Sequence, residues 1–352
     1  MMNTEYILTE SLSDAERKSA LARAAECIRD GGLVVFPTET VYGLGANALD
    51  PNAASAIYAA KGRPSDNPLI IHIANPADAV DYTDAPPLYF ALAERFMPGP
   101  LTVVLPAKSI IPKTVRAGLP TVAVRCPSHP IARELISLSG VPIAAPSANL
   151  SGSPSPTCFK HVCDDMNHRV NMIIDGGESE IGLESTIVKL EENGEAVLLR
   201  PGKITPSELL DVLPELTISS AVTEALKDGE TVLSPGMKYR HYAPKAPVIL
   251  LESDEISRQK YISEQNGQIA VLAYSEYLSD YKLLSSSPDV YDLGSALDPV
   301  TQAHRLFYLL REIDKIGYDC IFAPLPAKDG VSLALYNRMI RAAAYTIIKL
   351  ND

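Results

Sequence analysis

One stretch, residues 36–72, constrains the fold of this chain more than any other. A short apolar run ends at Phe36 and another begins at Leu69. Between them lie a hydroxyl-rich turn (PTETVYG), a helical segment and a loop with two cations (KGRP). Short apolar runs bounded by Gly and Pro are typical of buried strands, so the stretch predicts a strand, a helix and a second strand. Both polar clusters fall at strand ends, where α/β folds place ligand sites.

The two cations of this stretch, Lys61 and Arg63, suit an anionic ligand such as a polyphosphate. Lysine acts as a point charge, and arginine binds phosphate or carboxylate as a two-pronged fork. The alternative is a solvated basic loop, because Lys and Arg are ordinarily surface residues. The stretch alone leaves both interpretations open.

The same pattern continues through roughly the first 210 residues. A capping box at Ser13–Glu16 predicts a helix that stops at Gly31-Gly32, and Asp50 is placed to cap a second helix. The alternation of strands and helices is irregular, which favours an α/β domain with a mixed sheet over a purely parallel one. The expected strands are 33–36, 69–74, 101–105, 121–125, 142–145, 173–174, 185–190 and 197–199. The expected helices are 53–60, 88–96, 130–138 and one that Thr205 caps.

The length of 352 residues favours two domains. Residues 214–246 become polar and lose periodicity, yet they contain SPGMKYRHYAP, which is denser in cations and aromatics than an inert linker. We expect this segment to contact ligand. The predicted parts are therefore a first domain (1–213), a linker (214–246) and a compact Rossmann-like α/β domain (247–352). In the last of these, strands are expected at 248–251, 269–273, 290–293 and 320–323, and helices include 300–315 and a final one over 330–348.

Charge and cysteine usage exclude several classes of protein. The net charge of −12 argues against a broad phosphate-binding surface, although a small basic cleft is compatible with it. The cysteines are five, scattered, and form neither a disulfide nor a zinc pattern. No apolar run approaches the roughly 18 residues of a membrane span, and the polar N-terminus is unlike a signal peptide. These features predict a cytoplasmic protein.

The residues that carry chemistry do not form a standard signature. A phosphate loop, a complete dinucleotide glycine motif, a His-Glu-x-x-His motif and a nucleophile elbow are all absent. Polar residues gather instead at predicted strand ends: Thr38, Thr40, Tyr42, Lys61, Arg63, Asn67, His72, Thr121, Arg125, Ser147, Asn149, Ser185 and Arg200. Three arginines and a lysine suit a triphosphate and a carboxylate. They indicate catalysis by positioning and charge neutralisation, as in nucleotidyl transfer.

A plainer interpretation applies to each of these residues by itself. A polar group at a strand end often satisfies only the local backbone. A lone histidine inside a strand, such as His72, is more often structural than functional.

Several long motifs resemble the YrdC domain family: PTETVYGL, KGRPSDNPL, PSANLSG, ESTIV and LRPG. SPGMKYRHYAP followed by an α/β domain resembles the long, two-domain form of that family. The resemblance covers nearly the whole chain. It implies a twisted open sheet with a large concave cavity, and a nucleotidyltransferase that makes L-threonylcarbamoyladenylate and pyrophosphate from ATP, L-threonine and bicarbonate. The product would serve the threonylcarbamoyl-adenosine modification of tRNA.

The resemblance also implies roles for single residues. Threonine would be held by Thr40, His72, Arg125, Ala145 and Ser185, with Arg125 pairing its carboxylate. ATP would be held by Lys61, Arg63, Asn67, Thr121, Ser147, Ser155, Arg200 and Tyr242, the last acting as a lid from the linker. The family's KxR and SxN signature, expected to be catalytic, matches Lys61, Arg63, Ser147 and Asn149.

The resemblance implies Mg²⁺ as the metal of the ATP complex. No carboxylate cage is evident, so we expect phosphates and water to hold the ion, with Glu39 and Glu184 as candidate outer helpers. A downstream tRNA threonylcarbamoyl transferase complex is a candidate partner, whereas a membrane or a stable nucleic-acid complex is not expected.

Two other functions compete with this one. A double-stranded RNA or tRNA binder would use the same cavity, but the acidic balance argues against it. A carbamoyltransferase-type maturation module would carry cysteine-rich zinc segments, which this chain lacks.

Overall fold

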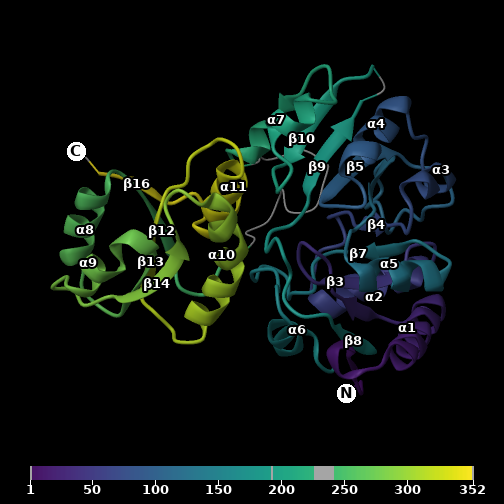
Figure 1. The fold of residues 1–352 in the computed structure, drawn as a ribbon, viewed down its shortest axis with the longest axis horizontal. Coiled ribbons are helices and arrows are strands. Elements are labelled where there is room, and N and C mark those ends of the chain that lie inside the picture. Colours follow the sequence, from purple (N-terminus) through teal and green to yellow (C-terminus); the bar gives the residue numbers. More distant parts are fainter. Residues whose placement is uncertain (1, 192, 226–241, 351–352) are drawn as a thin grey trace. The chain divides into compact units, whose positions relative to one another are not determined.

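The computed structural model describes residues 2–191, 193–225 and 242–350. The chain divides into two compact units, which are described separately. The first holds most of the described residues up to 222, and the second holds 242–350 with the short pieces 152–154 and 223–225. Figure 1 shows the elements of both units. Within the described ranges, no helix is long and apolar enough to cross a membrane.

The first unit is built on an eleven-stranded mixed sheet, which confirms the expected α/β class. The strand order is β1-β8-β2-β3-β7-β4-β6-β5-β9-β10-β11. The bounds are β1 Glu5–Leu8, β2 Val34–Phe36, β3 Gly43–Asn47, β4 Ile70–His72, β5 Leu101–Pro106, β6 Thr121–Arg125, β7 Ile143–Ala145, β8 Met172–Asp175, β9 Thr186–Leu190, β10 Ala196–Arg200 and β11 Thr217–Ile218.

The predicted helices of this unit begin within two residues of their expected starts. Ser13 and Glu16 form the expected capping box at the start of α1, and the Asp50 side chain accepts a hydrogen bond from the Asn52 amide at the start of α2. α1 packs with α5 over a core cluster that includes Leu21, Ile28 and strand residues such as Phe36. The helices are α1 Asp14–Arg29, α2 Pro51–Lys61, α3 Ala79–Tyr82, α4 Pro87–Phe96, α5 Pro130–Ser139, α6 Phe159–Met166 and α7 Pro206–Leu210.

The strand register lines polar side chains up on one face of the sheet. β4 and β6 run parallel and pair His72 with Arg125. β5 runs antiparallel to β6 and pairs Thr102 with Arg125. Residues opposite each other on paired strands point to the same face, so these three side chains form one row. Two residues away along these strands, and so on the same face, lie Ile70, Val104 and Ala123. They form an apolar cluster with Ile187 and Leu199.

The second unit is a five-stranded sheet in the order β14-β13-β15-β12-β16, and all its strand pairs are parallel. Figure 1 shows α8 and α9 on one face of this sheet and α10 and α11 on the other. The strands are β12 Val248–Glu252, β13 Ile269–Tyr274, β14 Asp289–Gly294, β15 Cys320–Pro324 and β16 Ile347–Lys349. The helices are α8 Glu255–Ser263, α9 Leu278–Lys282, α10 Pro299–Asp314 and α11 Ser332–Ala342.

The predicted final helix over 330–348 is wrong in its second half. α11 ends at Ala342, and the chain turns at Ala344 and Tyr345, whose φ angles are 46° and 63°. It then forms β16, which pairs with β12. Strands β1, β3 and β11 and helices α3 and α6 were not predicted.

Candidate active site

Lys61 joins the two halves of the predicted catalytic signature. α2 ends at this residue because Gly62 adopts a left-handed conformation, with φ of 62°. The Lys61 side chain is buried, and its Nζ donates to the carbonyl oxygens of Ser147 and Asn149, each at 2.5 Å. Ser147 Oγ donates to Asn149 Oδ1 at 2.5 Å. A lysine and a Ser-x-Asn motif 86 residues apart in sequence thus form one cluster.

The loop after α2 carries an amide that lacks partners. Arg63 Nη2 donates to the carbonyl oxygens of Asn67 (3.3 Å) and Pro68 (3.2 Å). The Asn67 side chain is fully buried, and neither its Nδ2 nor its Oδ1 has a hydrogen-bond partner. Buried polar groups without partners are rare in proteins and mark places that a ligand or water completes. Asn67 is therefore a candidate ligand contact.

Arg125 forms a second buried cluster at the end of β6. Its Nη2 donates to Glu39 Oε1 and to Thr40 Oγ1, both at 2.8 Å. The Thr40 hydroxyl lies 2.8 Å from that of Thr38. Arg125 Nε and Glu39 Oε2 are buried and have no partners. The guanidinium is thus held by a carboxylate and a hydroxyl, while its buried Nε–H has no partner.

His72 lies beside Arg125 and is neutral at physiological pH. Its Nδ1 is 3.3 Å from the carbonyl oxygen of Ile143, and its ring meets Phe36 edge-on at 6.0 Å. Burial, and then the Arg125 charge, lower the pKa of His72 from 6.5 to about 3. A neutral imidazole adds no charge to the arginine cluster and offers a donor and an acceptor.

Ser185 and Arg200 form a third contact group. The Ser185 hydroxyl lies 2.7 Å from that of Thr102. Arg200 donates from Nε to the Ser185 carbonyl (3.0 Å) and from Nη2 to its hydroxyl (3.1 Å). The preceding carboxylate, Glu184, accepts a hydrogen bond from Ser155 Oγ at 2.6 Å. Four predicted or candidate residues thus meet around residues 184–185.

Three other predicted residues have neighbours of their own. Thr121 begins β6, at the opposite end from Arg125, and lines a cavity of about 490 Å³ with Lys189 and Glu195. Ala145 ends β7 and pairs with Ile70 of β4. Tyr242 belongs to the second unit, where its ring stacks on Phe307 at 5.0 Å and Arg338 lies over it at 5.8 Å.

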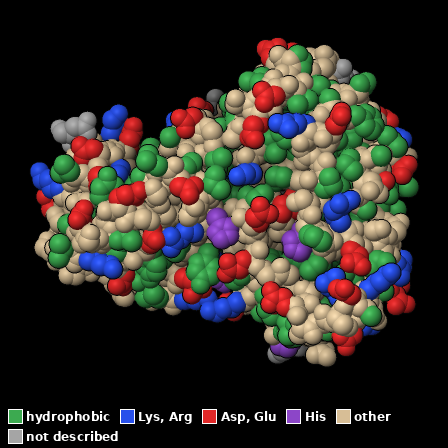
Figure 2. Space-filling model, viewed as in Figure 1, with side chains coloured by type: hydrophobic (Ala, Val, Ile, Leu, Met, Phe, Trp, Pro, Cys, Tyr) green, Lys and Arg blue, Asp and Glu red, His purple; other side chains and the backbone are tan. Residues whose placement is uncertain are grey.

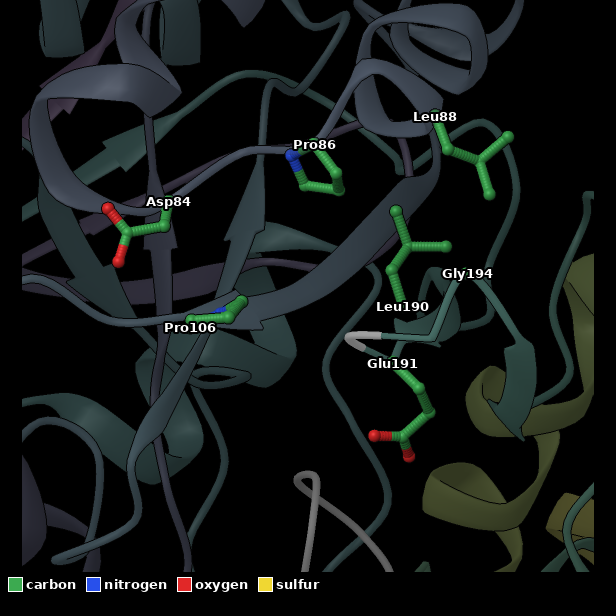
Figure 3. A pocket seen from close by; sticks show the side chains of 7 residues that line it. All are labelled: Asp84, Pro86, Leu88, Pro106, Leu190, Glu191 and Gly194. Carbon is green, nitrogen blue, oxygen red and sulfur yellow. The ribbon is translucent and has the colours of Figure 1, made fainter.

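A neighbouring pocket of about 350 Å³ contains none of the predicted residues (Figure 3). It shares Pro106, Leu190 and Glu191 with the cavity that Thr121 lines. The whole lining is Asp84, Pro86, Leu88, Pro106, Leu190, Glu191 and Gly194.

Two contacts of the site were missed by sequence reasoning. Glu39 was considered only as an outer metal helper, although it lies between Thr38 and Thr40 in the PTET motif. Thr102 was hidden in the apolar run of β5, and only the register with Arg125 reveals its place.

On the face that Figure 2 shows, acidic and basic side chains are interspersed, and they form no broad basic patch. In the described part of the chain, no group of three or more His, Cys, Asp or Glu residues is arranged to hold a metal ion.

Comparison with known proteins places this chain among characterised relatives. A family model described as "Telomere recombination" (Sua5/YciO/YrdC) matches residues 26–202, and "Threonylcarbamoyl-AMP synthase, C-terminal domain" matches residues 204–344. The threonylcarbamoyl-AMP synthase of Pyrococcus abyssi is 47% identical over 335 residues, covering 93% of this chain and 95% of the relative. The Bacillus subtilis synthase is 43% identical over 347 residues, covering 97% of each.

A solved structure agrees with this placement. The crystal structure of P. abyssi Sua5 complexed with L-threonine matches with a TM-score of 0.86 and 43% identity over 99% of both chains.

The chain therefore belongs to the Sua5/YciO/YrdC family, in the two-domain form that carries the Sua5 C-terminal domain. It is an enzyme of the threonylcarbamoyl-AMP synthase type, a nucleotidyltransferase, which confirms the family and activity predicted from its motifs.

Proposed function

We propose that this enzyme joins L-threonine, bicarbonate and ATP in the first unit, with a separate buried cationic cluster for each anionic group. The observation that carries the proposal is the pair of clusters around Lys61 and Arg125. One cation is held by main-chain oxygens and the other by a carboxylate and a hydroxyl. A triphosphate and an amino-acid carboxylate are ligands of the matching charge.

The threonine side of the site is the row that ends β4 and β6. Arg125 pairs the substrate carboxylate, and Thr40, His72, Ala145 and Ser185 surround it. A crystal structure of a homologue contains L-threonine, which supports an amino-acid site in this fold. The buried, neutral His72 favours a small polar ligand over a second anion there.

The ATP side follows the loop after α2 and the Ser-x-Asn turn. Its residues are Lys61, Arg63, Asn67, Thr121, Ser147, Asn149, Ser155, Arg200 and Tyr242. Support comes from the cluster that Lys61 makes with Ser147 and Asn149, and from the unpartnered amide of Asn67.

The reaction needs charge stabilisation more than a protein nucleophile. Threonine and bicarbonate give N-carboxy-threonine, whose carboxylate oxygen attacks the α-phosphorus of ATP, and pyrophosphate leaves with the electrons of the broken P–O bond. The cations stabilise the negative charge that develops on the phosphate oxygens.

Magnesium arrives with ATP in this proposal. Glu39 and Glu184 do not make a cage for it, because each already binds a neighbouring side chain through one oxygen. Phosphates and water therefore hold most of the ion's coordination shell.

We propose that residues 1–213 carry out catalysis, that residues 214–246 close the site, and that residues 247–352 have an accessory role. Most of the linker, 226–241, lies outside the described residues. We expect the enzyme to act in the cytoplasm and to supply a tRNA threonylcarbamoyl transferase complex.

Pyrophosphate release tests the proposed function. We expect release only when ATP, threonine and bicarbonate are all present. Release that is unchanged when threonine is omitted would show that the site serves another reaction.

The lid is tested by truncation from Val232 onward and by Tyr242→Ala. Both changes should weaken ATP retention in equilibrium binding. Equal ATP affinity in the truncated and full-length proteins would remove the lid from the proposal.

A further inference from the structure

The ion pair of Glu39 and Arg125 leaves one acceptor and one donor unused. The two side chains are 4% and 5% exposed, and Nη2 donates to Oε1 at 2.8 Å. Glu39 Oε2 and Arg125 Nε are buried and lack hydrogen-bond partners. An unpaired atom on a buried charged group is unfavourable, so the pair is incomplete without a ligand.

The two unused atoms match the two charged groups of an α-amino acid. A carboxylate accepts hydrogen bonds and fits the Arg125 N–H, whereas an ammonium donates and fits the Glu39 oxygen. Building on the threonine site proposed above, we propose that Glu39 Oε2 binds the amino group of threonine and accepts the proton that this nitrogen loses before it is carboxylated.

The backbone around Glu39 holds this oxygen in place. The carbonyls of Glu39 and Thr40 accept hydrogen bonds from the amides of Ile181 (2.8 Å) and Gly182 (3.1 Å). Thr38 Oγ1 accepts from the amides of Thr40 and Val41 at 3.2 and 3.3 Å. Contacts on both sides therefore fix the turn, and the carboxylate is positioned before threonine arrives.

Proton transfer to Glu39 makes the carboxylation balance. Threonine enters as an ammonium, which is not a nucleophile. Glu39 takes one proton and becomes a carboxylic acid, and the free amine attacks the carbon of bicarbonate. A C–N bond forms, the C–O bond to the bicarbonate hydroxyl breaks, and that hydroxyl leaves as water with a second proton from nitrogen. The product carries N–H and a carboxylate.

Apart from Arg125, the titratable neighbours of Glu39 carry no charge near pH 7. Burial lowers the pKa of His129, which interacts with the Glu39 charge, and raises the pKa of Cys126 to about 11. His72, which pairs with Arg125 across β4 and β6, has its pKa lowered to about 3. These three groups are neutral near pH 7, so the carboxylate of Glu39 supplies the negative charge facing Arg125.

The amino group itself provides the test. Calorimetric titration would compare threonine with 2,3-dihydroxybutanoate, which has a hydroxyl in place of the ammonium, on the full chain. Wild-type enzyme should bind threonine about tenfold or more tightly than the analogue. Glu39→Gln should weaken threonine binding by a similar factor and leave analogue binding within about twofold. Glu255→Gln is a matched control, because Glu255 pairs with Arg258 at 2.5 Å in the second unit.

Two binding outcomes overturn the proposal. Equal loss of both ligands in Glu39→Gln would show that Glu39 acts only by holding Arg125. Equal affinity of the wild-type enzyme for both ligands would exclude an acceptor for the ammonium, and this arm needs no variant to fold. Failure of the wild-type enzyme to bind threonine at all would instead contradict the proposed threonine site.

The proton-accepting step is tested by kinetics. In Glu39→Gln, solvent must take the proton from the threonine ammonium. The increase of kcat/KM for threonine with pH should therefore occur at higher pH than in the wild-type enzyme. If the pH dependence of kcat/KM is the same in Glu39→Gln and the wild type, Glu39 is not the proton acceptor.

Discussion

The two units bury their polar side chains in different places. In the first, buried charged and polar groups such as Lys61, His72 and Arg125 lie at the ends of short elements. In the second, the described buried charged side chains lie on α10 and α11, and the buried strand residues are apolar. The polar groups at its strand ends are partly exposed and bind one another, as Asp292 and Arg305 do at 2.7 Å.

We propose that the reaction centre lies in the first unit. Burying a charge costs free energy unless a partner compensates, so a fold keeps such groups mainly where function needs them. Among the described strands of the second unit, no buried side-chain amide lacks a partner as that of Asn67 does. The predictions below place the chemistry in the first unit.

The largest effect is expected at the KxR motif. Lys61→Ala and Arg63→Ala should each lower turnover by about a hundredfold or more, because each removes a cation from the proposed phosphate site. Lys349→Ala, which removes an exposed lysine from the second unit, should leave turnover unchanged. Circular dichroism would establish folding, and full activity in both motif variants would contradict the phosphate site.

The next effect is a pH-dependent loss of stability in the first unit. The pKa of His72 in the folded state, about 3, lies below its ordinary value of 6.5, so the unfolded state takes up a proton first as pH falls. This contribution to stability is complete above pH 6.5, declines as pH drops toward 3, and amounts to a loss of about 2 kcal/mol at pH 5. Urea denaturation at pH 7.5 and pH 5 would measure it. The same pH difference in His72→Gln should be smaller by about that amount, and an equal difference would contradict a buried neutral His72.

A smaller effect should distinguish the two substrates. Arg125→Lys keeps the charge but loses the guanidinium fork, so KM for threonine should rise about tenfold while KM for ATP changes little. Steady-state kinetics with each substrate varied in turn would measure both constants. A parallel rise in both would place Arg125 outside a dedicated threonine site.

The smallest effect is expected in the second unit. Arg305→Ala breaks a partly exposed ion pair, which should cost about 0.5 kcal/mol of stability and leave turnover unchanged. Denaturation and pyrophosphate assays would test both. A large fall in turnover would show that this unit contributes directly to chemistry.

The sequence predicts most elements of the fold because, in these elements, the local sequence signals and the tertiary packing favour the same secondary structure. The capping residues Ser13, Asp50 and Thr205 begin helices as expected. β3 was missed because Gly43-Leu44-Gly45 looks like a turn. In the structure a Cβ at Gly45 would lie 2.7 Å from the Phe36 ring, so glycine serves close packing inside a strand.

The candidate site was less accessible to sequence reasoning, since its contacts are long-range. No local pattern shows that Glu39 binds Arg125, 86 residues away, or that Thr102 faces the same guanidinium. The over-extended final helix has a similar cause. The alanines 342–344 favour a helix, but pairing with β12 draws the end of the chain into the sheet.

The contacts of Lys61 imply that the residues of the KxR and SxN signature do not tolerate substitution equally. Its ammonium binds main-chain carbonyl oxygens of Ser147 and Asn149, and every amino acid supplies such an oxygen. The main-chain part of this anchor therefore does not depend on the side chains of the turn, whereas it does require a long cationic side chain at position 61. Substitutions that accumulate in related chains should leave the lysine until last.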